Sequence, residues 1–202
     1  QLIKAITGRI VPVDKLPMDV GVVVQNVSTV IAIKEAIVND KPLIDRVITV
    51  SGSGIKEPKN LKVKIGTLIK DVIEECGGFK KEVKKVIVGG PMMGFTQMNL
   101  DSPITKGCSG ILVWTENEYQ DFLANSICIN CGKCISSCAF GLMPTLINKF
   151  IRNKLYEKAL DYGIMFCKEC GACAYSCPAK IPLVQTFRMG KDIIRKLILN
   201  KK

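Results

Sequence analysis

The sequence contains no histidine among its 202 residues. This absence excludes Rieske centres, zinc sites that combine cysteine with histidine, and any acid–base mechanism that depends on an imidazole. No apolar run reaches the length of about 18 residues that a membrane-spanning helix requires. No basic-then-apolar leader opens the sequence, so we expect no secretory signal. Because the chain begins at Gln1 without a methionine and runs directly into sequence typical of a folded domain, we expect a fragment or processed form of a longer protein.

The charge is strongly basic, with 29 Lys and Arg against 18 Asp and Glu and a net charge of +11. From residue 140 onward the count is 12 basic against 4 acidic residues. This excess of basic residues has two interpretations. It reflects either solvated helix faces in a lysine-rich proteome or attraction to an acidic partner or an anionic membrane. No aromatic-rich basic stripe or nucleic-acid-reading motif is present, so no nucleic acid partner is predicted. Walker A and G-x-G-x-x-G phosphate loops are also absent.

Two cysteine clusters organise the second half of the chain, and each has the spacing C-x2-C-x2-C-x3-C. The first contains Cys128, Cys131, Cys134 and Cys138, and the second contains Cys167, Cys170, Cys173 and Cys177. Bacterial ferredoxins hold [4Fe-4S] clusters with this spacing, and the fourth cysteine binds the other cluster. Three cysteines two residues apart can surround one cube, while the fourth begins a segment that leads away. We therefore predict crossed ligation, in which Cys177 completes the first set of three and Cys138 completes the second.

Two zinc sites of four cysteines each are the main alternative to iron–sulfur clusters. Zinc ribbons usually pair two C-x2-C knuckles across a longer loop, whereas here three thiols fall within seven residues. Disulfides fit less well, because closely spaced thiols without a secretory signal indicate a reducing compartment and a metal. Cys76 and Cys108 stand apart from both clusters, and we expect them to be small buried residues.

The pattern upstream of the clusters predicts two further regions. Residues 1–45 contain a β-rich stretch at 21–27 and helical spacing at 28–37, and the polar junction between them suits either an ordinary helix cap or a ligand site. Residues 46–115 contain predicted strands at 47–52, 61–65, 86–88 and 111–114, with a helix from 67 to 76. This order of elements predicts a small mixed domain of the β-grasp type.

Residues 116–202 are predicted to be helical around the cysteine clusters. Helices are expected at 116–125, at 144–162 with a break near Asn153, and at 182–200. Corresponding cysteines lie 39 residues apart, and a helical linker of that length indicates an α-helical ferredoxin module. The last helix has a basic face that could pack on this module or dock to a membrane partner. That face contains Arg188, Lys191, Arg195 and Lys196. The predicted fold class is therefore α+β.

Several segments resemble one known family closely and in the same order along nearly the whole chain. In the cluster region they are CINCGKC, GLMP after the fourth cysteine, and CKECGACAYSCPAKIPLVQTFRMGK. Upstream they are GVVVQNVSTV, VITVSGSGIKEP with IGT, and GGPMMG with TKGCSGILV. They are similar to the C subunit of the Rnf ion-translocating ferredoxin:NAD oxidoreductase complex. The VITVSGSGIKEP stretch is similar to the SLBB (soluble ligand-binding β-grasp) domain.

This resemblance implies an electron-transfer subunit of a membrane-associated oxidoreductase and translocase. Two [4Fe-4S] clusters would relay single electrons between a flavin that reacts with NADH and the partner subunits. The implied location is peripheral, at the cytoplasmic face of the cell membrane. The implied partners are the other Rnf subunits and an acidic ferredoxin.

The N-terminal part of this family resembles the flavin subunit of respiratory complex I. Residues 1–45 would then be the C-terminal remnant of an FMN- and NADH-binding domain. The positions that would line part of the FMN site are Val24, Gln25, Asn26 and Thr29. Two departures weaken the match: Gln25 and Ser28 stand where related subunits tend to carry asparagine or glutamate, and Ala139 stands where proline usually follows the fourth cysteine. Ala139 should still allow Cys138 to bind iron, but it puts in doubt how sharply the chain turns there.

Two other functions remain open at this stage. A cobalamin reductase of the propanediol-utilisation type shares this architecture, and it would act on a corrinoid without a membrane partner. A non-redox adaptor would use the clusters only to hold the fold. Co-purification with membrane subunits distinguishes the first alternative, and the reduction behaviour of the clusters distinguishes the second.

Overall fold

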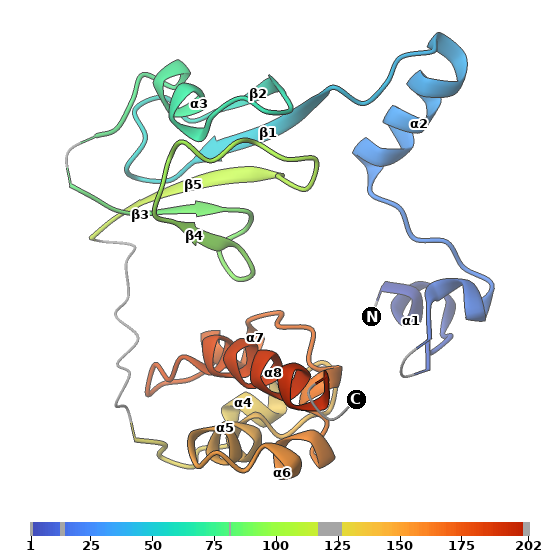
Figure 1. Cartoon of the computed structure of the whole chain (residues 1–202), viewed down its shortest axis with the longest axis vertical. Helices are drawn as coiled ribbons and strands as arrows, with labels where there is room; N and C mark the ends of the chain where they lie inside the picture. The colour runs from blue at the N-terminus through green and yellow to red at the C-terminus, as the bar shows by residue number, and fades with distance from the viewer. Residues whose placement is uncertain (1, 13–14, 81, 117–126, 200–202) are drawn as a thin grey trace. The chain divides into compact units, whose positions relative to one another are not determined.

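The structure is a computed structural model that describes residues 2–12, 15–80, 82–116 and 127–199 (Figure 1). The chain divides into two compact units, Gln1–Arg46 and Val47–Lys202. Among its described residues, the first unit contains three helices and, at its end, the first two residues of strand β1 (Asp45–Ser51). The helices are α1 (Leu2–Thr7), the 3-10 helix η1 (Pro17–Val20) and α2 (Val27–Asn39).

The strand predicted at residues 21–27 is wrong. Residues 22–26 form no strand, and α2 already begins at Val27. Asn26 caps this helix, because its side-chain oxygen accepts a hydrogen bond of 2.9 Å from the backbone N–H of Ser28. A valine-rich stretch forms a strand only when a neighbouring strand supplies hydrogen bonds and packing, and none of the described strands pairs with residues 22–26.

The second unit begins with a five-stranded sheet in the order β2-β1-β5-β3-β4. The strands are β1 (Asp45–Ser51), β2 (Lys59–Lys64), β3 (Val83–Val88), β4 (Phe95–Gln97) and β5 (Gly110–Thr115). Strand β5 is parallel to β1 and antiparallel to β3, and β3 is antiparallel to β4. All four predicted strands are confirmed. Strand β4 was not predicted, because its three residues are too few for an alternating pattern and none of them is buried.

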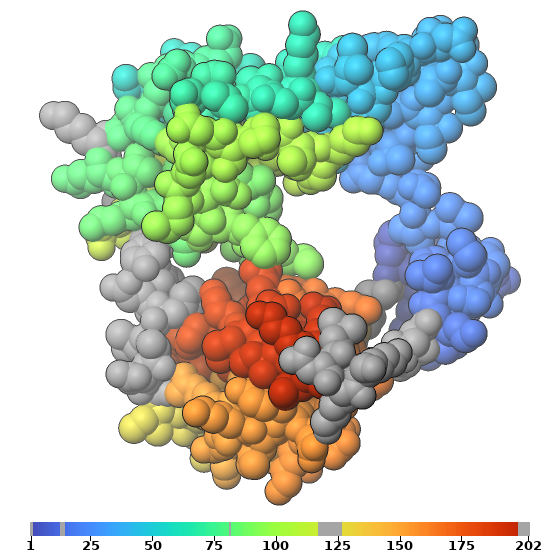
Figure 2. Space-filling model, viewed as in Figure 1, coloured from blue at the N-terminus to red at the C-terminus, as the bar shows by residue number. Residues whose placement is uncertain are grey.

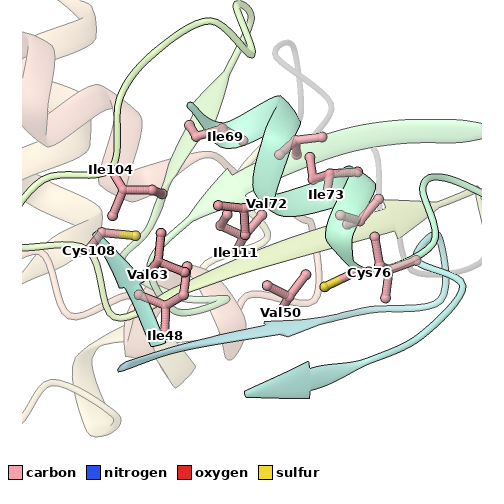
Figure 3. Close-up of a cluster of buried hydrophobic side chains, with 13 residues drawn as sticks. Ile48, Val50, Val63, Ile69, Val72, Ile73, Cys76, Ile104, Cys108 and Ile111 are labelled. Atoms are coloured by element: carbon pink, nitrogen blue, oxygen red, sulfur yellow. The ribbon is translucent and has the colours of Figure 1, made fainter. Parts of the chain in front are cut away.

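Helix α3 (Ile69–Glu75) covers one face of this sheet, and its side chains form the core with those of the strands (Figure 3). Ile69, Val72, Ile73 and Cys76 follow the spacing i, i+3, i+4 and i+7, and each is at most 2% exposed. This single stripe places every large apolar side chain of the helix against the strands. Full burial of an isoleucine or valine stabilises the fold by about 1.5–3 kcal/mol. The prediction that Cys76 and Cys108 are buried is confirmed.

The remaining part of the second unit is helical. Its elements are α4 (Lys133–Ser136), α5 (Pro144–Arg152), α6 (Tyr156–Asp161), the 3-10 helix η2 (Ile164–Phe166), α7 (Ala172–Tyr175) and α8 (Leu183–Leu199). The predicted break is confirmed, since α5 ends at Arg152 and Lys154 adopts a positive φ of 58°. The helix predicted at 116–125 lies outside the described residues. Within the described part of the chain, no helix combines the length and apolarity needed to cross a bilayer.

Helices α5 and α8 pack directly against each other, and α8, in red, lies against the orange helices in Figure 2. Gly190 of α8 allows this close approach. A Cβ atom at that position would lie 2.8 Å from Cδ1 of Ile151 on α5 and 3.2 Å from Cδ1 of Ile164. The crossing of α5 and α8 therefore depends on the missing side chain, and it fixes the frame that holds the two cysteine loops.

Candidate metal centres

The two cysteine loops have the same backbone conformation, 39 residues apart in the sequence. Asn130 and Glu169 adopt φ values of 53° and 54°, and Gly132 and Gly171 adopt 74° and 84°. Each glycine is followed at once by a four-residue helix, α4 or α7. A positive φ turns the chain sharply and favours glycine, so these paired positions curl each loop into a tight arc.

The segments after the fourth cysteines also match each other. The N–H of Gly141 donates to the carbonyl of Cys138 at 3.1 Å, and the N–H of Lys180 donates to that of Cys177 at 3.1 Å. Both donors have a positive φ. Ala139 therefore turns the chain as the proline does in the second segment.

The cysteines line two cavities, which we call the first and the second cavity. The first has a volume of about 90 Å³ and is lined by Cys128, Cys131, Cys134 and Cys177. The second has a volume of about 20 Å³ and is lined by Cys138, Cys167, Cys170 and Cys173. Each cavity takes three cysteines from one loop and the fourth from the other. This grouping is the one that crossed ligation requires, although ligation itself stays a prediction.

The arrangement of the thiols differs from that of a single-ion site. In the described part of the chain, no three or more Cys, Asp or Glu side chains are grouped so that they could hold one metal ion. Tetrahedral zinc requires four ligands that converge on one point at about 2.0–2.3 Å. Thiols spread around a cavity instead suit a group with several metal atoms, each bound by one cysteine.

Burial changes the acidity of the thiols. Burial raises the pKa of Cys134 and of Cys167, and it raises the pKa of Cys173 to about 12. The neutral thiol is favoured there because a buried anion loses its hydration. Metal binding requires the thiolate, so a cationic group in the cavity has to offset this cost. The iron ions of a cluster carry such positive charge, and the buried thiols therefore fit an iron–sulfur group.

Backbone N–H groups already point at two of the sulfur atoms in the second cavity. The N–H of Glu169 donates to Sγ of Cys167 at 3.4 Å, and the N–H of Leu142 donates to Sγ of Cys138 at 3.4 Å. Such donors stabilise negative charge on sulfur. The loops are thus arranged to receive anionic sulfur.

Comparison with known proteins identifies the same regions. Residues 47–96 match the SLBB domain, and residues 127–181 match the 4Fe-4S dicluster domain. The second match supports iron–sulfur clusters as the group that the cysteines hold.

The chain is 53% identical over 192 residues to the C subunit of the proton-translocating ferredoxin:NAD(+) oxidoreductase complex of Clostridium ljungdahlii, covering 95% of this chain and 42% of that protein. It is 44% identical over 191 residues to the C subunit of the Na(+)-translocating ferredoxin:NAD(+) oxidoreductase complex of Acetobacterium woodii, covering 95% of this chain and 43% of that protein. It is also 44% identical to the C subunit of the ion-translocating oxidoreductase complex of Yersinia enterocolitica, covering 98% of this chain and 28% of that protein.

The chain is a homologue of these C subunits. The resemblance predicted from the sequence is therefore confirmed over nearly the whole chain. This C-subunit homologue spans less than half the length of the relatives that it matches. Its α+β character is confirmed in coarse form by the single sheet, the SLBB match and the 4Fe-4S match. The flavin-domain remnant at residues 1–45 stays a prediction.

The sequence pattern had placed Lys191 on a solvated basic face. In the C-subunit homologue it is instead buried, at 4% exposure. Its Nζ donates to the carbonyl of Cys167 and to Oε1 of Glu169, both at 2.6 Å. Nε of Arg188 donates to Oε2 of Glu169 at 2.9 Å. Burial alone would raise the pKa of Glu169, but hydrogen bonds from Lys191 and Arg188 outweigh it and lower that pKa. This network ties the second loop to α8.

Sequence reasoning also missed Asn148. It lies on the buried face of α5 at 7% exposure, among positions that the apolar pattern had assigned to packing. Conversely, Leu155 and Leu160 continue the apolar helical spacing of residues 144–162 in the sequence, yet they are 44% and 39% exposed, and the helix is broken before them at Lys154, which has a positive φ. A polar residue inside an apolar stripe was the available signal for Asn148.

The residues predicted to contact FMN lie at the start of α2. Val24, Gln25 and Asn26 are exposed, and Thr29 is half-buried. Asn26 acts as the helix cap described above, which agrees with the simpler of the two interpretations of this junction. A cap and a ligand contact are compatible for an asparagine, because its amide nitrogen stays available. The assignment of these residues to a flavin site stays a prediction.

Proposed function

We propose that this chain is the electron-relay part of a C subunit in an ion-translocating ferredoxin:NAD oxidoreductase complex. Two [4Fe-4S] clusters would be held with crossed ligands. One is bound by Cys128, Cys131, Cys134 and Cys177, and the other by Cys138, Cys167, Cys170 and Cys173. The observation that carries this proposal is the division of the eight thiols between the first and second cavities in these two sets.

Each cluster, when bound, accepts and releases one electron at a time. The chain's own residues prepare the sites for that role. Thiols are gathered from both loops, apolar side chains of α5 and α8 exclude water from the second cavity, and backbone N–H groups of Glu169 and Leu142 stabilise charge on sulfur. The proximity of the two sets, which share the same pair of loops, suits transfer of electrons between them.

The wider role follows from the printed names of the relatives, and we extend it to this chain as part of the proposal. An FMN site that reacts with NADH would lie in the N-terminal part of the complete protein, with Val24, Gln25, Asn26 and Thr29 at its edge. Other complex subunits, and an acidic ferredoxin, would exchange electrons with the clusters. The location would be peripheral, at the cytoplasmic face of the membrane.

Paired substitutions test both the cluster count and the crossing. The intact chain, purified without oxygen, should contain about eight irons. In the variant Cys128→Ala/Cys177→Ala, both changes fall on one crossed site, so about four irons and the EPR signal of one cluster should remain. In Cys128→Ala/Cys138→Ala, the changes fall on different crossed sites, and no intact four-cysteine site should remain.

Uncrossed ligation predicts the opposite result for the two double variants. A colourless intact chain with about two zincs would contradict the proposal altogether. The two double variants carry the same number of alanines, so each is the matched control for the other.

A further inference from the structure

The first and second cavities differ at two equivalent positions. The 39-residue offset that superimposes the cysteine loops also pairs Thr145 on α5 with Val184 on α8, and Asn148 with Phe187. Thr145 and Asn148 line the first cavity, and Val184 and Phe187 line the second. A hydroxyl and a carboxamide therefore face the first cavity where two apolar side chains face the second.

Asn148 is buried without a hydrogen bond to its carboxamide oxygen, although it is only 7% exposed. A buried carboxamide oxygen without a donor destabilises a fold by about 1–3 kcal/mol, so this orientation of the carboxamide is unfavourable. Its neighbours Ile147 and Ile151 on the same helix are fully packed. The side chain instead lines the first cavity, and rotation of the carboxamide can present its NH₂ group to an acceptor there.

Thr145 lies one helical turn before Asn148 and reaches the same cavity. Its Oγ1 is 3.6 Å from Sγ of Cys128. Once that sulfur is a thiolate it can only accept, so the hydroxyl becomes the donor. The equivalent Val184 has the same shape as threonine but no hydroxyl. The first cavity thus contains two side-chain donors that the second lacks.

We propose that Asn148 and Thr145 donate hydrogen bonds to sulfur in the first cavity and raise the reduction potential of the [4Fe-4S] centre held there. This inference rests on the crossed ligation proposed above. Reduction adds negative charge to a cluster, and donors to its sulfur atoms stabilise the more negative state. Because these two side-chain donors line the first cavity alone, they raise the potential of the first centre and leave that of the second unchanged.

Glu169 of the second loop forms ion pairs with Lys191 and Arg188, and these charges act on the second centre in every variant considered below. The test therefore compares each centre with itself between variants and does not compare the two centres with each other. Asn148 and Thr145 are uncharged, and neither takes part in these two ion pairs. Their substitution should leave the second centre unaffected.

The experiment is an anaerobic redox titration of the full chain, followed by EPR. Thr145→Val preserves the side-chain shape and removes the hydroxyl, and Asn148→Leu removes the amide while keeping the number and branching of the side-chain heavy atoms. Each should shift the one-electron equilibrium of the first centre about tenfold toward the oxidised state, which is 59 mV for one electron. The double variant should show a larger shift than either single variant. Val184→Thr is the matched gain-of-donor control and should raise the potential of the second centre alone.

The centres are assigned with Cys128→Ala/Cys177→Ala, which leaves only the second centre under crossed ligation. Unchanged potentials in both single variants, or equal shifts at both centres, would overturn the inference. If Asn148→Leu loses its iron, Thr145→Val and Val184→Thr still decide the matter. Failure of the proposed function has a different result, namely loss of both centres in Cys128→Ala/Cys177→Ala. This inference alone fails if Thr145→Val and Asn148→Leu keep eight irons and show unshifted potentials.

Discussion

Replacement of Lys191 by methionine should destabilise the helical part of the second unit strongly. Methionine has a similar length but no charge and no donor. The Lys191 side chain is 5% exposed and makes two contacts of 2.6 Å, one to the carbonyl of Cys167 and one to Glu169. The substitution leaves that carbonyl without this donor and leaves Glu169 with Arg188 alone.

The magnitude follows from the burial of the partners. Removal of one member of a buried ion pair destabilises a protein by about 3–5 kcal/mol. Glu169 is 25% exposed and keeps Arg188, so solvent and the second cation reduce the loss, and we expect about 2–3 kcal/mol. A change of 1.4 kcal/mol corresponds to a factor of ten. If the whole loss appears in the unfolding step, the unfolding rate should rise about 30- to 100-fold.

The assay is the first-order loss of visible absorbance in guanidinium chloride under anaerobic conditions. A rate is the appropriate quantity, because a protein with tightly bound groups does not unfold as a simple two-state system. Lys196→Met is the matched control, because Lys196 is an exposed residue of the same helix. Its effect should stay within about 0.5 kcal/mol.

A double variant separates the ion pair from simple loss of packing. Glu169→Gln alone leaves Lys191 buried and charged, so it should also accelerate unfolding. Combined with Lys191→Met, it removes both charges, and the combined effect should be smaller than the sum of the two. Equal rates for Lys191→Met and Lys196→Met, or strict additivity in the double variant, would refute the reasoning.

Two further predictions concern other parts of the chain. Burial raises the pKa of Cys76, so the folded chain holds that thiol proton more tightly than the unfolded chain, and this stabilisation is lost as the pH rises above the unfolded value of about 8.5. The difference in unfolding rate between the wild type and Cys76→Ala, measured in urea, should therefore shrink from pH 7 to 10, and a constant difference would contradict this. In the complete protein, Gln25→Ala should weaken FMN binding about fivefold to tenfold through the loss of one hydrogen bond, whereas Lys34→Ala, an exposed change on α2, should not; equal FMN content in both variants would remove Gln25 from the flavin site.

Patterns that repeat within a short stretch of sequence predicted their structures well. The spacing of Leu68, Ile69, Val72 and Ile73 predicted a helix with one apolar stripe at α3, because a helix needs only its own period to define a buried face. The cysteine spacing also predicted which thiols share a cavity, since each loop supplies three of them and the segment that begins at the fourth cysteine leads away from its own loop.

Features that depend on distant partners were not predictable in the same way. The valines at 22–24 indicated a strand, but none of the described strands pairs with them. The pattern around Lys191 indicated a surface residue because its partners, Glu169 and the carbonyl of Cys167, come from a loop more than twenty residues earlier. The role of Asn148 emerged only once α5 was placed beside the cysteines. In each case the missing information was the identity of a neighbour in space, which periodicity does not contain.

The exchange of the fourth cysteines has a consequence for how the chain holds together. Under crossed ligation, one cluster ties Cys134 to Cys177 and the other ties Cys138 to Cys167, so the smaller closed loop lies inside the larger. Covalent closure of one loop of this length lowers the conformational entropy of the unfolded chain. On the model used for disulfides, this stabilises the folded state by about 3.5–4 kcal/mol. The clusters would then act as nested cross-links of the chain as well as redox groups. Neither half of the repeat could keep its cluster if the chain between the loops were cut and the halves separated.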